Sequence, residues 1–273
     1  MDIYHIYERT FDICVDRFIL NLYQRRRKVQ FCISNLIKQS GTIYLDKMNY
    51  TEFQKVITTH QKNNAQEAIT ENRKEIRVKK EKTVAKNLQR IFEATLKIGN
   101  KKGFQAMSMR DLSNETELSM GALYAYFKNK ENLMVMLQRN GRDNFQKILE
   151  DCANSSEHPL ENFRQLIKTH LFMSEALRPW FVFTYMEGKN LNKKERKVAV
   201  DHELHSDNII VSLLKKCEEQ NIFKKQNHQV TAVMIKSLLT DWYLKRWKYA
   251  KMNISVDEYT SHILDLIESY CGK

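Results

Sequence analysis

The stretch 103–133 constrains the fold of this chain more than any other part of the sequence. It has the pattern of two short helices, a tight turn and the start of a third helix. Ser108 stands three residues before Asp111, a spacing typical of the capping box at a helix start. We therefore expect a short helix over 109–116, with Leu112 pointing inward.

A second short helix is predicted to begin at Ser119, and a third at Asn129, because both residue types favour the position before a helix. This is the spacing of a helix-turn-helix, in which Ser113 is small where the two short helices approach most closely. Leu112, Leu118, Leu123 and Tyr126 are expected to point inward. The second helix would present outward, toward a major groove, the residues Ser119, Met120, Ala122, Tyr124 and Ala125.

The run 123–133, Leu-Tyr-Ala-Tyr-Phe-Lys-Asn-Lys-Glu-Asn-Leu, resembles the hallmark of TetR-family transcriptional regulators. Gly103-Phe104, Arg110-Asp111-Leu112 and Ser119-Met120-Gly121 fit the same pattern, and the resemblance covers about 83–137. The family often has glycine in the turn, where this chain has Glu117, and usually alanine where Ser113 stands. If the turn needs a positive φ, Glu117 carries a strain of about 1 kcal/mol.

The resemblance implies an all-α protein with a three-helix DNA-binding domain over 83–137 and a C-terminal helical ligand-binding and dimerisation domain over 138–273. A helical or partly disordered extension with a basic linker, 1–82, precedes them. The composition agrees, because 7 glycines and 2 prolines in 273 residues are few for a sheet with tight turns. Helices are expected over 83–101, 130–152, 160–177, 179–186, 193–220, 227–251 and 256–270.

The resemblance also implies which residues contact DNA. Apolar atoms on the second helix can meet thymine methyl groups, and hydroxyl and basic groups at the helix starts can reach phosphates. No arginine, asparagine or glutamine occurs in 119–126, so DNA shape would contribute to specificity. Core packing is the competing interpretation of Tyr126, and the preferred one for Phe127. The predicted contacts are Ser108, Arg110, Ser119, Met120, Gly121, Ala122, Tyr124, Tyr126, Lys128 and Lys130.

The charge distribution points to the same kind of partner. The formal net charge is +12, and all but two of these charges lie in residues 1–150. An excess of this kind favours a polyanion, here double-stranded DNA. A basic arm directly precedes residue 83, and it is either a set of phosphate or minor-groove contacts or a solvated polar helix. Its members are Arg73, Lys74, Arg77, Lys79, Lys80 and Lys82.

Aromatic residues gather in the C-terminal half and suggest an apolar cavity, with ordinary core packing as the competing interpretation of each residue singly. The stretch 241–249 resembles family members that respond to acyl-CoA thioesters, and Lys245, Arg246 or Lys248 could meet coenzyme A phosphates. The predicted ligand-binding residues are Trp180, Phe183, Tyr185, Met186, Trp242, Arg246 and Trp247.

The sequence carries no signature of an enzyme, since it has no glycine-rich phosphate loop, GxSxG elbow or HExxH motif. No cofactor is expected. His202 and His205 could bind a metal, but a polar pocket or an exposed helix face is preferred because no third ligand is close in sequence. Five scattered cysteines indicate reduced thiols in a cytoplasmic protein. We expect neither a signal peptide nor a membrane span.

Residues 1–82 leave three interpretations open. They form an interaction or DNA-contacting extension, or a passively packed or partly disordered addition, or they are not part of the mature protein, whose translation would then start at Met48 or later. Within them, a polar helix is expected from Thr51 through Phe53, Val56 and Ile57.

The resemblance thus implies a homodimeric, ligand-responsive regulator that acts as a repressor. Two recognition helices would enter successive major grooves about 34 Å apart. An apolar effector in the C-terminal domain would shift the helix that connects the two domains, with an acyl-CoA thioester as one candidate. The alternative is a ligand-independent DNA-binding or partner-recruiting protein that uses the N-terminal extension.

Overall fold

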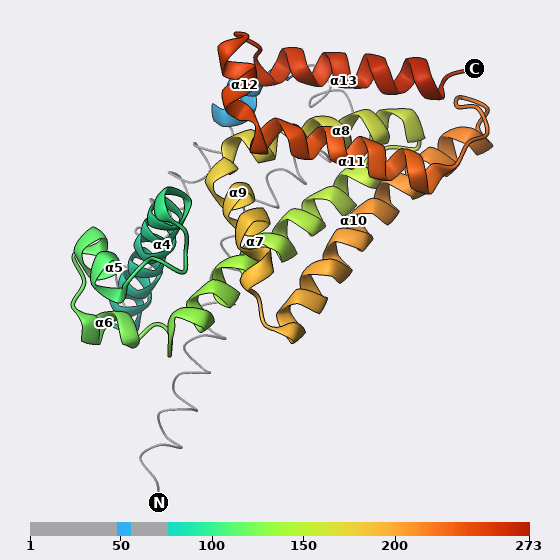
Figure 1. The fold of residues 1–273 in the computed structure, drawn as a ribbon. Helices are drawn as coiled ribbons and strands as arrows, with labels where there is room; N and C mark the ends of the chain where they lie inside the picture. Colours follow the sequence, from blue (N-terminus) through green and yellow to red (C-terminus); the bar gives the residue numbers. More distant parts are fainter. Residues whose placement is uncertain (1–47, 56–75) are drawn as a thin grey trace, which may run out of the picture. The chain divides into compact units, whose positions relative to one another are not determined.

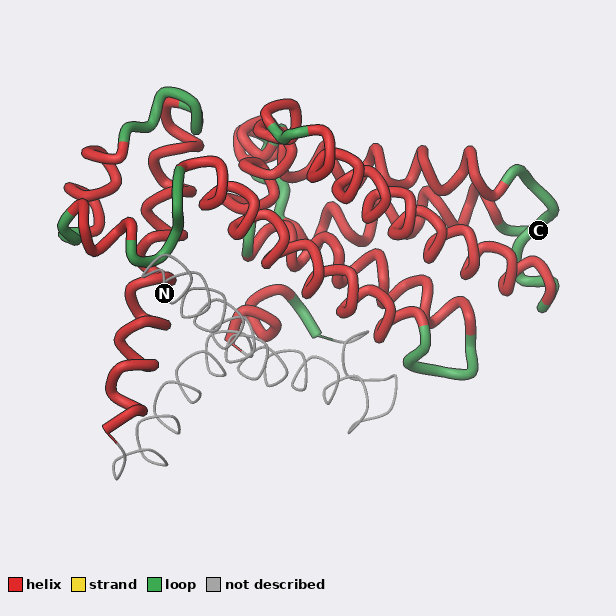
Figure 2. The backbone as a smooth tube through the Cα atoms, turned by 90° about the horizontal axis from the view of Figure 1, so that it is seen from below, coloured by secondary structure: helices red, strands yellow, loops and turns green. Residues whose placement is uncertain are grey.

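The computed structural model describes residues 48–55 and 76–273, and the regular elements in these ranges are helices (Figure 1). The tube view in Figure 2 likewise shows only helices and loops in the described part of the chain. The expected all-α class is therefore confirmed. The described residues fall into two compact units, one that ends at Leu137 and one that contains 48–55 and Gln138–Lys273.

The first unit consists of α4 (Ile76–Lys102), α5 (Met109–Thr116), α6 (Met120–Tyr124) and the first turns of α7 (Lys130–Ala153). The helix α4 begins seven residues earlier than the sequence pattern predicted. It ends at Lys102, and the next residue, Gly103, has a φ of 84°, the left-handed conformation that glycine adopts without steric cost. The core of this unit is built by buried side chains from all of these helices: Ile91, Phe104, Leu112, Leu123, Phe127 and Leu133.

The second unit contains the rest of α7 and, after it in the chain, six further helices. These are α8 (Pro159–Ala176), α9 (Arg178–Glu187), α10 (Lys193–Glu219), α11 (His228–Leu244), α12 (Arg246–Lys251) and α13 (Val256–Cys271), with a short 3-10 turn at Gly188–Asn190. The central helix is α8, which contacts α9, α10, α11 and α13 (Figure 1). Twelve of its 18 residues are buried, so it carries the core of this unit.

The single helix expected over 227–251 is interrupted at Lys245, where the chain turns into α12. The reason lies in aromatic packing. The ring of Trp242 lies 5.0 Å from that of Tyr249 and 4.8 Å from that of Tyr259. In an unbroken helix, residues seven apart are separated by about 10 Å along the axis, so Trp242 and Tyr249 could not stack. The hydroxyl of Tyr249 also donates to Asp241.

The segment 48–55 belongs to the second unit, and its helix begins at residue 50, one position before the expected start. Phe53 is only 2% exposed, and its ring lies 5.4 Å from that of Phe172 in α8. The backbone N–H of Tyr50 donates to Asp257 Oδ1 at 2.8 Å. This part of the predicted extension is therefore docked on α8 and α13, whereas residues 1–47 and 56–75 lie outside the described residues.

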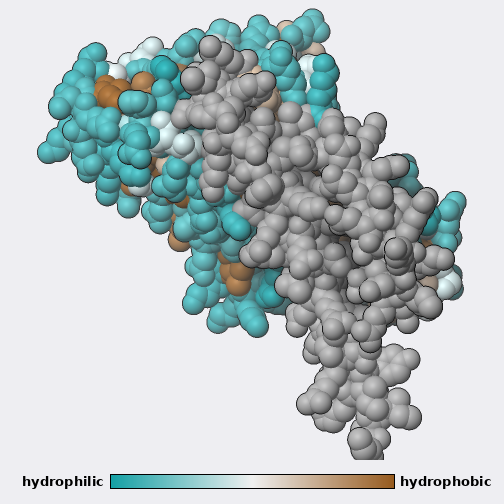
Figure 3. Space-filling view, turned by 180° about the vertical axis from the view of Figure 1, so that it is seen from behind, coloured by the Kyte–Doolittle hydropathy of each residue, from teal (hydrophilic) through white to brown (hydrophobic). Residues whose placement is uncertain are grey.

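On the face shown in Figure 3, the described surface is mainly hydrophilic. In the space-filling view of Figure 3, brown patches are small and separated among the described atoms on that face. None of the helices in the described ranges is both long enough and apolar enough to cross a membrane.

Candidate nucleic-acid interface and cavity

A complete capping box opens the first short helix, α5. The backbone N–H of Ser108 donates to Asp111 Oδ2 at 2.7 Å, and that of Asp111 donates to Ser108 Oγ at 3.1 Å. Lys102 donates to the same carboxylate at 2.7 Å. The hydrogen bonds from Lys102 and then Ser108 hold the pKa of Asp111 well below its usual range. The predicted start of α5 is therefore confirmed, and it is fixed by local contacts.

The turn between the short helices has the left-handed conformation at Glu117, with a φ of 52°. The strain expected for a residue other than glycine at this position is therefore present. Two contacts hold the turn: Ser113 Oγ donates to Leu118 O at 2.6 Å, and Arg90 pairs with Glu117 at 3.0 Å. The hydroxyl at position 113 thus ties the end of α5 to the start of α6.

The second short helix, α6, is capped by Ser119, whose Oγ accepts from the N–H of Ala122 at 3.2 Å. Its outer surface carries Met120 and Tyr124, which are 37% and 47% exposed. Leu123 is fully buried below them and anchors the helix to its unit. Exposed apolar and phenolic groups on a short capped helix have the form of a surface that reads a groove.

The remaining predicted DNA contacts are distributed around this surface. Tyr126 is half-buried, and its hydroxyl accepts from Asn87 Nδ2 at 2.9 Å. The Lys130 ammonium donates to Gln105 O at 2.8 Å and lies 4.9 Å from the Phe104 ring centre. Ala122 is half-buried, and Phe127 is buried as the core interpretation predicted. The exposed members of the predicted set are Ser108, Arg110, Ser119, Met120, Gly121, Tyr124 and Lys128.

Their roles in DNA contact remain predictions. The side chains of the basic arm lie outside the described part of the structure, although the backbone of α4 is helical from Ile76 onward.

A cavity of about 510 Å³ lies within the second unit, between α7, α8, α9, α10 and α11. Its apolar wall is aromatic: the ring of Phe145 lies 5.0 Å from the rings of both His170 and Phe181. Burial lowers the pKa of His170 well below its usual value, and Lys236 acts in the same direction, so this imidazole is neutral. The principal apolar and polar groups of the lining are Phe145, Leu149, Trp180, Phe181, Tyr243, Arg142, His170, Thr184 and Lys236.

Only Trp180 and Tyr185 of the predicted ligand-binding residues line this cavity. Phe183 is in the core, and Met186 and Trp247 are 57% and 60% exposed. Trp242 is fully buried in the aromatic stack with Tyr249 and Tyr259. Arg246 pairs with Glu175 at 3.1 Å and covers the Trp242 ring. The aromatic residues of the sequence are thus divided between a cavity and a packed core.

Sequence reasoning missed Arg142 and Phe145 as members of the lining. A signal was available in Gly141, a glycine inside a long helical pattern, which often marks a close approach. A Cβ atom at this position would lie 2.0 Å from the Trp180 ring. Glycine is therefore needed for the indole to pack against α7 and form the cavity wall.

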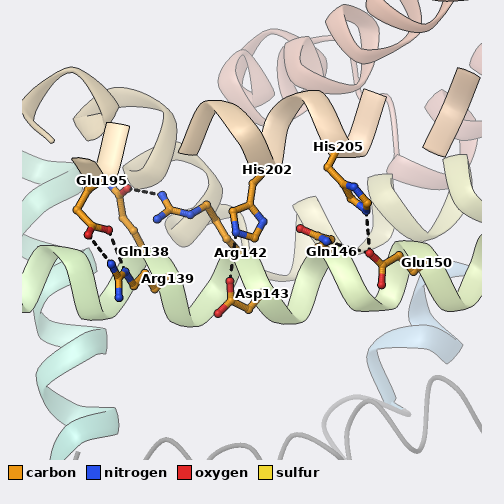
Figure 4. Close-up of polar contacts among 9 residues, drawn as sticks. All are labelled: Gln138, Arg139, Arg142, Asp143, Gln146, Glu150, Glu195, His202 and His205. Atoms are coloured by element: carbon orange, nitrogen blue, oxygen red, sulfur yellow. Dashed lines mark hydrogen bonds and ion pairs between the residues drawn. The ribbon is translucent and has the colours of Figure 1, made fainter. Parts of the chain in front are cut away.

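Polar contacts join α7 to α10 beside the cavity (Figure 4). Arg139 binds both oxygens of Glu195, with 2.9 Å between Nε and Oε2. His202 and His205 contact carboxylates on α7, at 3.4 Å from Asp143 and 2.8 Å from Glu150. The described residues contain no group of three potential metal ligands, and these two histidines serve as contacts between helices.

Comparisons with known proteins agree with this architecture. The family model for bacterial regulatory proteins of the tetR family matches residues 91–136. The HTH-type transcriptional regulator HbdR of Aromatoleum sp. (strain CIB) is 22% identical over 190 residues, which cover 69% of this chain and 82% of HbdR.

Two solved structures have the same fold. PfmR, a TetR-family regulator from Thermus thermophilus, superposes with a TM-score of 0.60 at 23% identity, over 66% of this chain and 97% of that one. AibR in complex with isovaleryl coenzyme A and operator DNA gives 0.57 at 15% identity, over 68% and 98%. With the capped helices α5 and α6 at the matched positions, these findings show that residues 91–136 match the DNA-binding domain of bacterial regulatory proteins of the tetR family and that the chain shares the fold of TetR-family regulators.

Proposed function

We propose that the chain acts as a transcriptional regulator and not as an enzyme, as its match to the tetR family model over residues 91–136 and its similarity to the regulator HbdR support. We propose that it is a repressor that binds its operator as a homodimer and leaves the DNA when a small molecule occupies the cavity of the second unit. Residues 83–137 would act as the DNA-binding domain and 138–273 as the ligand-binding and dimerisation domain. The observation that carries the proposal is the surface of α6, where Met120 and Tyr124 are exposed on a helix anchored by the buried Leu123.

Exposed apolar side chains on α11 and α13 support the dimer. These two helices would pair with the same helices of a second copy in a four-helix bundle. Each of the exposed residues leaves more than half of its surface open to solvent, which is unusual for a group of large apolar residues in a monomer. The group consists of Val230, Val233, Met234, Leu266 and Tyr270.

The cavity supports ligand responsiveness, because its volume of about 510 Å³ lies in the range of small-molecule sites. It lies beside α7, a helix that starts in the first unit and continues into the second. A ligand can change DNA affinity only if it binds the DNA-incompetent state more tightly.

An acyl-CoA thioester remains one candidate effector, and AibR, solved with isovaleryl coenzyme A and operator DNA, supplies a precedent in a protein of similar fold. The basic residues that would meet its phosphates have intramolecular partners. Lys245 and Lys248 pair with Asp241, and Arg246 pairs with Glu175. An acyl group in the cavity would therefore need other cations for the coenzyme A portion.

Fluorescence anisotropy with DNA from upstream of the chain's own gene tests the proposal, with and without a panel of acyl-CoA thioesters. Tight, salt-dependent binding that one thioester releases would support both the repressor mechanism and that ligand class. Tight binding that no thioester releases would leave the DNA-binding function and discard the thioesters. Affinity no higher than for random DNA would exclude this promoter as the operator.

A further inference from the structure

Arg142 in α7 is a buried cation at the wall of the cavity, and only 7% of its surface is exposed. Its Nη1 donates to Gln138 Oε1 at 2.9 Å (Figure 4). Among the described residues, its Nε and Nη2 have no hydrogen-bond partner. Buried polar groups are rarely left in this condition, because an unmade hydrogen bond carries the full cost of desolvation.

The two unpartnered nitrogens form one edge of the guanidinium, and arginine uses this edge to bind a carboxylate in a bidentate manner. The same protein gives two examples. Arg139 binds Glu195 through Nε and Nη2, and Arg164 binds Glu268 through the same atoms at 2.7 and 2.6 Å. In Arg142 the corresponding edge has no partner among the described residues, so it has the geometry of a carboxylate site.

The nearby acidic groups do not complete this site. Both oxygens of Glu195 accept from Arg139, and Asp143 is 69% exposed with its oxygen 3.4 Å from His202. Burial lowers the pKa of Arg142, as expected for a cation taken out of water. An anion from outside the chain would relieve both the desolvation and the missing hydrogen bonds.

The rest of the lining favours an anion with an apolar body. Among the described residues, the cations Arg142, Lys189, Arg196 and Lys236 line the cavity together with one acid, Glu203. Lys236 lies 3.3 Å from Glu203 and donates to Ser206 Oγ at 2.6 Å. The charges of Lys236 and Glu203 therefore largely neutralise each other. The aromatic part of the wall offers flat apolar faces from Phe145, Trp180, Phe181 and Tyr243.

We propose that the cavity binds a small organic anion, a carboxylate carried on a flat apolar body, and that Arg142 grips the carboxylate through Nε and Nη2. The inference rests on the proposed function, in which this cavity holds the effector. Both nitrogens are buried in this structure, so binding includes a rotation of the Arg142 side chain toward the cavity that this residue lines. Because Arg142 is part of α7, the ligand acts directly on the helix that continues into the DNA-binding unit.

Isothermal titration calorimetry on the full chain tests the ligand class with phenylacetate, 3-phenylpropionate and indole-3-acetate, each beside its neutral amide. We expect at least one carboxylate to bind about tenfold or more tightly than its amide, as a charge-assisted bidentate contact requires. Equal affinities of each carboxylate and its amide, or no binding of any carboxylate, would overturn the inference.

Two variants test the role of Arg142. Arg142→Gln should abolish the preference for the carboxylate, and Arg142→Lys, which keeps the charge but not the fork, should lose most of it. If Arg142→Gln fails to fold, Arg142→Lys still tests the role of the guanidinium. Lys215→Gln removes an exposed cation of α10 outside the cavity lining and should leave the preference unchanged. A full preference in Arg142→Lys would assign the carboxylate to another group and overturn the role of Arg142.

Anisotropy with operator DNA separates this inference from the proposed function. A carboxylate that binds in the calorimeter but does not release DNA would support the ligand class and contradict the release mechanism. Intact operator binding together with identical affinities for carboxylates and amides would contradict the ligand class and leave the DNA-binding function standing.

Discussion

At the scale of single residues, the predicted DNA contact of Tyr124 is the one that a substitution tests most directly. Its side chain is 47% exposed on α6, where it can reach a phosphate or a base edge. We expect Tyr124→Ala to weaken operator binding by about tenfold or more, the loss of a contact of about 1–3 kcal/mol. Anisotropy measures the change, and Asn114→Ala, an exposed substitution on α5, is the control. Unchanged affinity in Tyr124→Ala would mean that α6 does not enter the groove as proposed.

A second prediction for a single residue concerns the left-handed backbone conformation at Glu117 and its effect on stability. Glu117→Gly and Glu117→Ala both remove its exposed ion pair with Arg90, but only alanine keeps a Cβ in the left-handed conformation. We expect the glycine variant to be more stable than the alanine variant by about 1 kcal/mol. Chemical denaturation followed by circular dichroism measures the difference. Equal stabilities would show that the backbone at this position carries no strain.

At the scale of elements, the helix over 50–55 is an integral part of the second unit. Phe53 fills a space beside Phe172, and truncating a buried phenylalanine typically costs about 3–5 kcal/mol. We expect Phe53→Ala to lower the stability of the full chain by an amount of this order in chemical denaturation. Lys55→Ala, an exposed change on the same helix, should have little effect. If both variants unfold like the parent, the segment does not contribute to this core.

The helices also differ in how well the sequence predicted them. Caps such as Ser108 and Ser119 are local signals, and they predicted the short helices well. The break at Lys245 depends on the stacking of Trp242 with Tyr259. These residues are 17 positions apart, and the hydrophobic periodicity of a single helix carries no information on such a contact. Trp180 and Trp242 are the same residue type, and the sequence offers no reason to treat them differently. Trp180 lines the cavity and Trp242 is buried in the core. The difference arises from how the neighbouring helices pack around each ring.

At the scale of the whole molecule, the proposed homodimer depends on the exposed apolar face of α11 and α13. Met234 on α11 is 55% exposed, and a carboxylate introduced there would be buried without a partner in the proposed bundle. We expect Met234→Glu to produce monomers in analytical ultracentrifugation and to lose most of its operator affinity. Leu204→Glu, at an equally exposed position on α10, is the matched control. A dimeric Met234→Glu protein would exclude this face as the interface.

Because α7 is long, a small tilt at one of its ends produces a larger displacement at the other. Its 24 residues form one uninterrupted helix, and about 18 Å of it separates Lys130 from Arg142 at 1.5 Å per residue. Such a helix acts as a lever arm: a tilt of about 5° around Arg142 moves the other end by about 1.5 Å. This displacement exceeds the range of about 0.5 Å over which N–H···O distances vary in hydrogen bonds. In the proposed mechanism, a ligand that shifts the Arg142 guanidinium slightly would therefore misalign contacts several helical turns away without unfolding any part of the protein.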